Sequence, residues 1–88
     1  MKLPEIAIQL PEWVEGFLAE RPLVFPNRED RMRLVIELAR RNVGERTGGP
    51  FGAAVFDQHG GLIAPGINLV LSRNLSILHA EIVAMLMA

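Results

Sequence analysis

The stretch that decides the fold reads Gly49-Pro50-Phe51-Gly52-Ala53-Ala54-Val55-Phe56 and continues as Asp57-Gln58-His59-Gly60-Gly61. Residues 53–56 are continuously apolar, which is typical of a strand buried on both faces. Residues 57–61 have the composition of a turn, and residues 62–71 resume an extended apolar pattern, so we predict a β-hairpin. Pro65 cannot donate a ladder hydrogen bond, which predicts that the second strand lies at the sheet edge and the first strand inside.

A helix is predicted to precede this hairpin, from Asn27 to Gly44. Asn27 is a good N-cap residue, and glycine commonly ends helices. Apolar residues recur between them at helical spacing, which predicts a core-facing side made of Met32, Val35, Ile36, Ala39 and Val43. On the solvent side we expect ion pairs between residues four apart, Glu29 with Arg33 and Glu37 with Arg41.

Residues 1–26 carry four of the six prolines and are predicted to form an N-terminal arm. We expect one short helix in it, because Pro11 suits a first helical position. Four apolar residues then fall on one side, which we expect to dock on the main body: Trp13, Val14, Phe17 and Leu18.

The end of the chain predicts a second helix, which starts after Ser76 and runs from Ile77 to Ala88. No glycine or basic last turn marks its end. We therefore expect that the chain is cut within this helix.

Composition disfavours several classes of function. The chain has 88 residues, a formal net charge of -1 and a pI of about 6.1, whereas nucleic-acid-binding domains usually show clustered basic residues and a high pI. It has no cysteine, so it can form neither a disulfide nor a thiolate metal site of its own. Its start lacks a leader pattern, and its most apolar stretch, residues 82–88, is far shorter than the ~20 residues that span a membrane. We expect a cytoplasmic protein with no membrane segment.

The triplet His79-Ala80-Glu81 is the candidate for chemistry. Residues two apart on a helix point about 200° away from each other, so His79 and Glu81 can converge only beyond a helix end. A metal ion at the helix N-terminus could then bind His79 while Glu81 reaches a water molecule. Alone, the triplet is weak support, because a structural histidine is commoner.

Three segments occur in the order found in the zinc-dependent deaminases of cytidine, guanine and tRNA adenosine: Gly49 to Val55, Gly66-Ile67-Asn68, and His79-Ala80-Glu81-Ile82. Residues 27–88 thus resemble the N-terminal part of a deaminase domain, and the Gly-Pro-Phe-Gly form is most similar to bacterial guanine deaminases. The resemblance implies an α/β fold with the cytidine-deaminase-like three-layer α/β/α architecture. This chain would hold only the first helix, the β-hairpin and the start of the zinc helix, which leaves strand 53–56 with an unpaired edge.

The resemblance also implies a role for each candidate residue. His79 would be a zinc ligand, and Glu81 would be the catalytic proton shuttle between water, the ring nitrogen and departing ammonia. Asn68 would hydrogen-bond the base, Phe51 would stack on it, and the backbone of Ala80 would add a contact. Two alternatives stay open, since Asn68 could satisfy a strand end and Phe51 could belong to the core.

The sequence departs from the family at two places. The family pairs its His-x-Glu with a downstream Pro-Cys-x-x-Cys, so two cysteine ligands of the Zn²⁺ ion are expected outside this chain. Because one protein ligand of three binds zinc weakly, we expect the chain alone to be inactive. The family often has Asp-Pro-Thr-Ala before its histidine, where this chain has Leu75-Ser76-Ile77-Leu78, which leaves the choice of base open.

These features predict that the full-length protein hydrolytically deaminates a small-molecule nucleobase, with guanine favoured, by zinc-activated water. A homodimer is expected. The runner-up is a tRNA adenosine or cytidine deaminase, and nucleic acid is disfavoured as a partner by the charge balance. The alternative of a different class is an inactive remnant that acts as an interaction module, which predicts neither zinc nor ammonia release.

Overall fold

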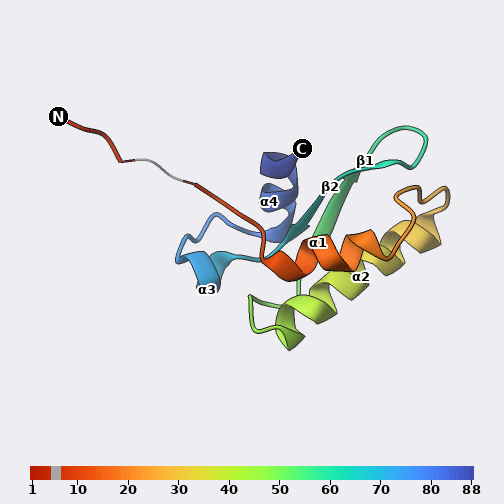
Figure 1. Ribbon diagram of the computed structural model, residues 1–88, viewed down its shortest axis with the longest axis horizontal. Helices are drawn as coiled ribbons and strands as arrows, with labels where there is room; N and C mark the ends of the chain where they lie inside the picture. Colours follow the sequence, from red (N-terminus) through yellow and green to blue (C-terminus); the bar gives the residue numbers. More distant parts are fainter. Residues whose placement is uncertain (5–6) are drawn as a thin grey trace.

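Two antiparallel strands lie at the centre of the computed structural model, which describes residues 1–4 and 7–88 (Figure 1). Strands β1 (Gly52–Phe56) and β2 (Leu62–Ile67) pair throughout, with a bulge between Val55 and Phe56, so the predicted hairpin is confirmed. Within these described ranges β1 pairs with β2 alone. All five β1 residues are consequently half-buried rather than fully buried as a central strand would be.

The turn of the hairpin is built around Asp57. Its Oδ1 accepts hydrogen bonds from the backbone N–H groups of Gly61 at 2.9 Å and of His59 at 2.8 Å. These bonds favour the charged carboxylate and so hold the pKa of Asp57 below its usual value. Gly60 has a φ of 85°, a left-handed conformation that glycine adopts without steric cost. The turn therefore uses the residue types that predict it.

Four helices accompany the hairpin in the described part of the chain: α1 (Glu12–Ala19), α2 (Arg28–Gly44), α3 (Val70–Arg73) and α4 (Ala80–Met87). The short helix of the arm and the helix that ends at Gly44 are present as predicted. None of these helices is long and apolar enough to cross a bilayer, a finding that covers residues 1–4 and 7–88.

The strand and helix that follow the hairpin turn are shorter than predicted. β2 ends at Ile67 instead of Leu71, because the Asn68 Oδ1 accepts a hydrogen bond from the Val70 N–H at 3.2 Å and starts a turn into α3. The last helix begins at Ala80 instead of Ile77. Residues 75–78 form a turn first, closed by the Leu78 N–H, which donates to the Leu75 carbonyl at 3.1 Å.

Helices α2 and α4 cover opposite faces of the hairpin (Figure 1). Both approach closely at a glycine: a side chain at Gly52 would meet the Val35 carbonyl of α2, and one at Gly66 would meet the Ala80 carbonyl of α4. Gly52 and Gly66 belong to adjacent cross-strand pairs, so they point to opposite faces of the sheet. The chain is therefore layered helix, sheet, helix, which confirms the predicted α/β class.

The face of α2 that meets the core differs from the predicted one. Leu34, Leu38 and Asn42 are buried, with exposed fractions of 2%, 0% and 0%, whereas Met32, Ile36 and Val43, predicted as core, are 46–58% exposed. Val35 and Ala39 are half-buried. Apolar residues stand on two sides of this helix, and the sequence pattern favoured the longer run. The buried side consists of Leu34, Leu38 and Asn42, which are spaced four residues apart, and the last of them is polar.

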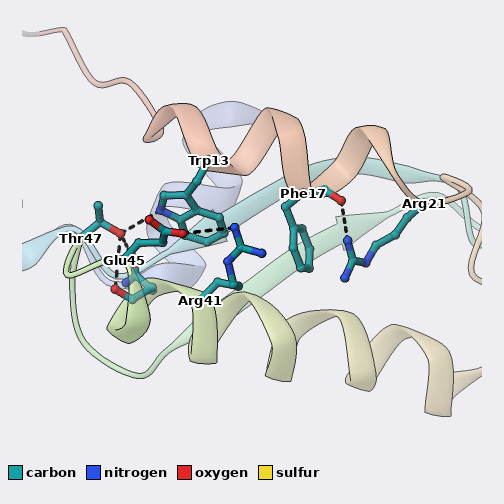
Figure 2. Close-up of polar contacts among 7 residues, drawn as sticks. Trp13, Phe17, Arg21, Arg41, Glu45 and Thr47 are labelled. Carbon is teal, nitrogen blue, oxygen red and sulfur yellow. Dashed lines mark hydrogen bonds and ion pairs between the residues drawn. The ribbon is translucent and has the colours of Figure 1, made fainter.

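Helix α1 docks on α2 through aromatic and charged side chains, as Figure 2 shows for Trp13, Phe17, Arg21 and Arg41. The Arg21 guanidinium lies 3.6 Å from the Phe17 ring centroid and pairs with Glu37 at 2.6 Å. Val14 and Phe17 are buried, which confirms that this side of the arm packs on the body. Because Glu37 pairs with Arg21, and Arg33 pairs with Asp30, both predicted ion pairs of α2 are wrong. The pairs along α2 are Asp30 with Arg33 and Arg41 with Glu45.

Replacing Asn27 with Ala is expected to lower the free energy of unfolding by about 0.5–2 kcal/mol. The Asn27 Oδ1 accepts a hydrogen bond from the Asp30 N–H at 2.9 Å and so caps the first turn of α2. Urea denaturation measures this change. Asn27→Asp, which keeps the acceptor, is the control and should stay near the wild-type value. Equal losses in the two variants would show that the cap does not act through this hydrogen bond.

Candidate functional site

The N-terminus of α4 carries both residues of the predicted chemical pair. His79 is the N-cap residue, with extended backbone angles, and Glu81 is the second residue of the helix. Both side chains are exposed. A carboxylate in the first turn is stabilised by the helix dipole. The structure thus places His79 and Glu81 at one helix end, the arrangement that their spacing requires if they are to act on a common ligand.

Two backbone hydrogen bonds bring the end of β2 beside this helix end. The Asn68 N–H donates to the Phe51 carbonyl at 3.2 Å, and the Leu69 N–H donates to the Leu78 carbonyl at 2.9 Å. Phe51, Asn68 and His79 come from three separate segments. Phe51 and Asn68 form the first of these bonds, and His79 directly follows Leu78, which accepts the second. The structure therefore gathers the predicted residues at one end of the hairpin.

Asn68 and Phe51 differ in how much of each is exposed at this end of the hairpin. Asn68 is 7% exposed, and its Oδ1 accepts the Val70 N–H. Its Nδ2 donates to no acceptor among residues 1–4 and 7–88. Phe51 is 59% exposed, so it does not belong to the core of the described chain. An aromatic face and an amide donor are thus both accessible beside the helix end.

Ala80, the first residue of α4, is buried, with 2% of its surface exposed. Its N–H is one of the first N–H groups of the helix, which have no partner within a helix. It donates to no carbonyl in the described part of the chain. The backbone of Ala80 is therefore available to an acceptor placed at the helix end.

The fit of a zinc ion to these residues is partial. The His79 imidazole is exposed and makes no hydrogen bond to any described residue, so it is free to act as a ligand. Residues 1–4 and 7–88, however, contain no group of three His, Cys, Asp or Glu side chains that could hold a metal ion. Since structural and catalytic zinc sites need at least three protein ligands, the chain offers one ligand and not a complete site.

A buried polar residue behind the site was not among the residues predicted from the sequence. Asn42 is fully buried in α2, and its Nδ2 donates to the Asn68 carbonyl at 2.9 Å and to the Gly49 carbonyl at 3.0 Å. The signal was available, because an asparagine stands four residues after Leu38 on the stripe that also contains Leu34. A polar residue at a core position implies specific hydrogen-bond partners.

Comparison with protein families and solved structures gives consistent matches. Residues 26–88 match the family described as the cytidine and deoxycytidylate deaminase zinc-binding region. A guanine deaminase from Nitrosomonas europaea is 40% identical, with a TM-score of 0.80, over 92% of this chain and 44% of that chain. A guanine deaminase from Bacillus subtilis is 39% identical, with a TM-score of 0.64, over 69% of this chain and 38% of that one.

A third structure, of the protein NE0047 in complex with 2,6-diaminopurine, is 41% identical, with a TM-score of 0.81, over 92% of this chain and 42% of that chain. The chain therefore spans less than half the length of the solved structures that it matches. A search of the curated proteins gave no match. The family match covers well over half of the residues and includes the hairpin, Asn68 and the His79 helix, so the chain belongs to the cytidine and deoxycytidylate deaminase zinc-binding family.

Proposed function

We propose that the protein containing this chain hydrolyses guanine to xanthine and ammonia. Family membership supports deamination, and similarity to two guanine deaminases at about 40% identity supports a purine base as substrate. The observation that carries the proposal is the pair of backbone hydrogen bonds that join Phe51 to Asn68 and Leu69 to Leu78. They support it because they bring the backbones of Phe51 and Asn68 beside the helix end that carries His79 and Glu81.

In this proposal His79 is one ligand of a zinc ion whose other ligands lie outside this chain. When bound, zinc lowers the pKa of water towards ~7 and so supplies a nucleophile at neutral pH. Glu81 takes a proton from the attacking water and passes it to a ring nitrogen. It then takes the proton of the hydroxyl group on the tetrahedral carbon and gives it to the amine, which leaves as ammonia while the carbonyl forms. Its position in the first turn, exposed and next to the helix end, leaves the carboxylate free to move a proton between these atoms.

Base recognition falls to three residues in the proposal. The free Nδ2 of Asn68 donates to an acceptor on the edge of the base, and Phe51 stacks on its face. The Ala80 N–H adds a second donor. Of the last two residues before the histidine, both of which differ from the family pattern, Leu78 is fully buried in the core and Ile77 is 65% exposed. Ile77 is therefore the one that can contact a substrate.

The test uses the protein as its gene encodes it, assayed for ammonia and xanthine from guanine and for bound zinc. Wild-type protein is expected to bind zinc and release ammonia, and His79→Ala is expected to lower the zinc affinity at least about tenfold. His59→Ala is the matched control, because His59 is exposed in the hairpin turn, and it should bind zinc as wild type does. Release of ammonia from tRNA adenosine but not from guanine would overturn the proposal that guanine is the substrate. A wild-type protein that neither binds zinc nor releases ammonia would overturn the proposal that the protein is a deaminase.

A further inference from the structure

A partly buried chain of hydrogen bonds links the N-terminal arm to the backbone of Asn68. Its centre is Asn42, whose side-chain amide is fully satisfied without water. The two Nδ2 protons go to the carbonyls of Gly49 and Asn68, at 3.0 and 2.9 Å. The Oδ1 accepts from the Thr47 hydroxyl at 2.6 Å. One amide therefore ties three segments together: α2, the loop before β1 and the end of β2.

The chain continues from Thr47 to the arm. The Thr47 Oγ1 accepts a hydrogen bond from the Trp13 Nε1 at 3.0 Å, as Figure 2 shows. Thr47 is thus a donor to Asn42 and an acceptor from α1 at the same time, which fixes the direction of its hydroxyl hydrogen. Its backbone N–H also donates to the Asn42 carbonyl at 3.0 Å. A change at Trp13 can consequently reach Asn42 through a single hydroxyl group.

The packing around this amide leaves little room for adjustment. A side chain at Gly48 would meet the Asn68 carbonyl and would lie 2.6 Å from the Asn42 Nδ2. The loop backbone is therefore pressed against the two groups that form the bond. Because closely packed interiors transmit small displacements, a rotated Asn42 amide would move the Asn68 carbonyl and the Gly49 carbonyl together.

We propose that Asn42 is a positioning residue for base recognition, and that Thr47 and Trp13 hold its amide in the required orientation. By holding the carbonyls of Asn68 and Gly49 on one nitrogen, Asn42 sets the spacing between the Asn68 amide and the Phe51 ring, two residues after Gly49. The N-terminal arm is thereby part of the substrate site although none of its residues touches the base. This inference rests on the proposed function, since it assigns a purpose to the position of Asn68.

The expected effect is on KM rather than kcat. Asn68 and Phe51 hold the base in the ground state and the transition state alike, and losing such uniform binding raises KM at unchanged kcat. Thr47→Val keeps the shape of the side chain but leaves the Asn42 Oδ1 and the Trp13 Nε1 without their partner. We expect KM for guanine to rise about tenfold, with kcat changed less than threefold.

Two further variants separate positioning from general loss of stability. Thr47→Ser retains the hydroxyl and is expected to restore KM to within twofold of wild type. Asn27→Ala, at the far end of α2 from Asn42, lowers stability through the lost helix cap but removes no hydrogen bond of this chain of contacts. It should lower the urea midpoint while KM stays within twofold of wild type. Trp13→Phe removes the Nε1 donor together with part of the ring, keeps an aromatic side chain against Phe17, and should raise KM in the same direction as Thr47→Val.

The outcomes are distinguishable. An active wild-type enzyme whose Thr47→Val and Trp13→Phe variants keep the wild-type KM would overturn the inference and leave the proposed function standing. An equal rise of KM in Asn27→Ala would also overturn it, because the effect would then follow stability. A wild-type protein that does not deaminate guanine would overturn the proposed function, and the inference with it.

Discussion

Replacing Glu81 with Gln is expected to lower kcat for guanine about 10²–10⁴-fold, the usual contribution of a positioned general acid and base. Glutamine has nearly the same shape as glutamate but cannot take a proton from water at neutral pH. Because Glu81 is exposed and makes no hydrogen bond to residues 1–4 and 7–88 in the structure, the substitution should leave the fold intact. Steady-state kinetics of ammonia release from guanine measure the loss, and the zinc content should remain that of the wild type.

Glu29→Gln is the matched control for this variant. Glu29 is also exposed and is the second residue of its helix, α2, so both substitutions remove the same charge from the same place relative to a helix N-terminus. Each loses a dipole interaction of about 0.3–1 kcal/mol. Glu29→Gln should therefore lower stability slightly and leave kcat unchanged. A Glu81→Gln enzyme with a kcat within threefold of wild type would remove Glu81 from the proton transfer.

The hairpin and the helix that precedes it were predictable because local chemistry and tertiary structure agree there. Asn27 caps α2, and Asp57 and Gly60 form the turn, as their residue types predict. The buried face of α2 was not predictable in the same way. Met32 and Leu34 are equally apolar, and only the position of α1 and of the hairpin decides which of them is covered. Periodicity identifies a helix but not its neighbours.

The candidate site also has a part that local sequence predicts and a part that depends on tertiary structure. Once a helix was predicted there, His79 and Glu81 could be placed at its end from their spacing, since no other position on a helix lets residues two apart meet. The tie between Asn68 and the loop before β1 could not be predicted, because it passes through Asn42, 26 residues away in the sequence. A single asparagine in an apolar stripe indicates a buried partner but does not identify it. The complete zinc site is beyond the reach of this sequence, which lacks cysteine altogether.

We expect a large loss of stability when a side chain is added at Gly66. It lies on β2 against α4, and a Cβ there would meet the Ala80 carbonyl and lie 2.5 Å from the Ala84 nitrogen and 2.7 Å from the Ala84 Cβ. Backbone atoms cannot swing away as a flexible side chain does, so Gly66→Ala requires α4 to shift. Overpacking of this kind lowers the free energy of unfolding by about 1–3 kcal/mol, which urea denaturation measures.

The same shift should reduce activity, because α4 carries His79 and Glu81 at its N-terminus. A displacement of about 1 Å can lower a rate ~10²-fold, so kcat/KM for guanine should fall by about that factor in Gly66→Ala. Gly16→Ala is the control, and it is expected to change the free energy of unfolding in the opposite direction. Gly16 lies within α1 with no atom within 4 Å of a Cβ, so this change should stabilise the protein by about 0.5–1 kcal/mol through helix propensity and leave kcat/KM unaltered. If Gly66→Ala were as stable and as active as the wild type, the close contact between β2 and α4 could not be what sets the position of the His79 helix end.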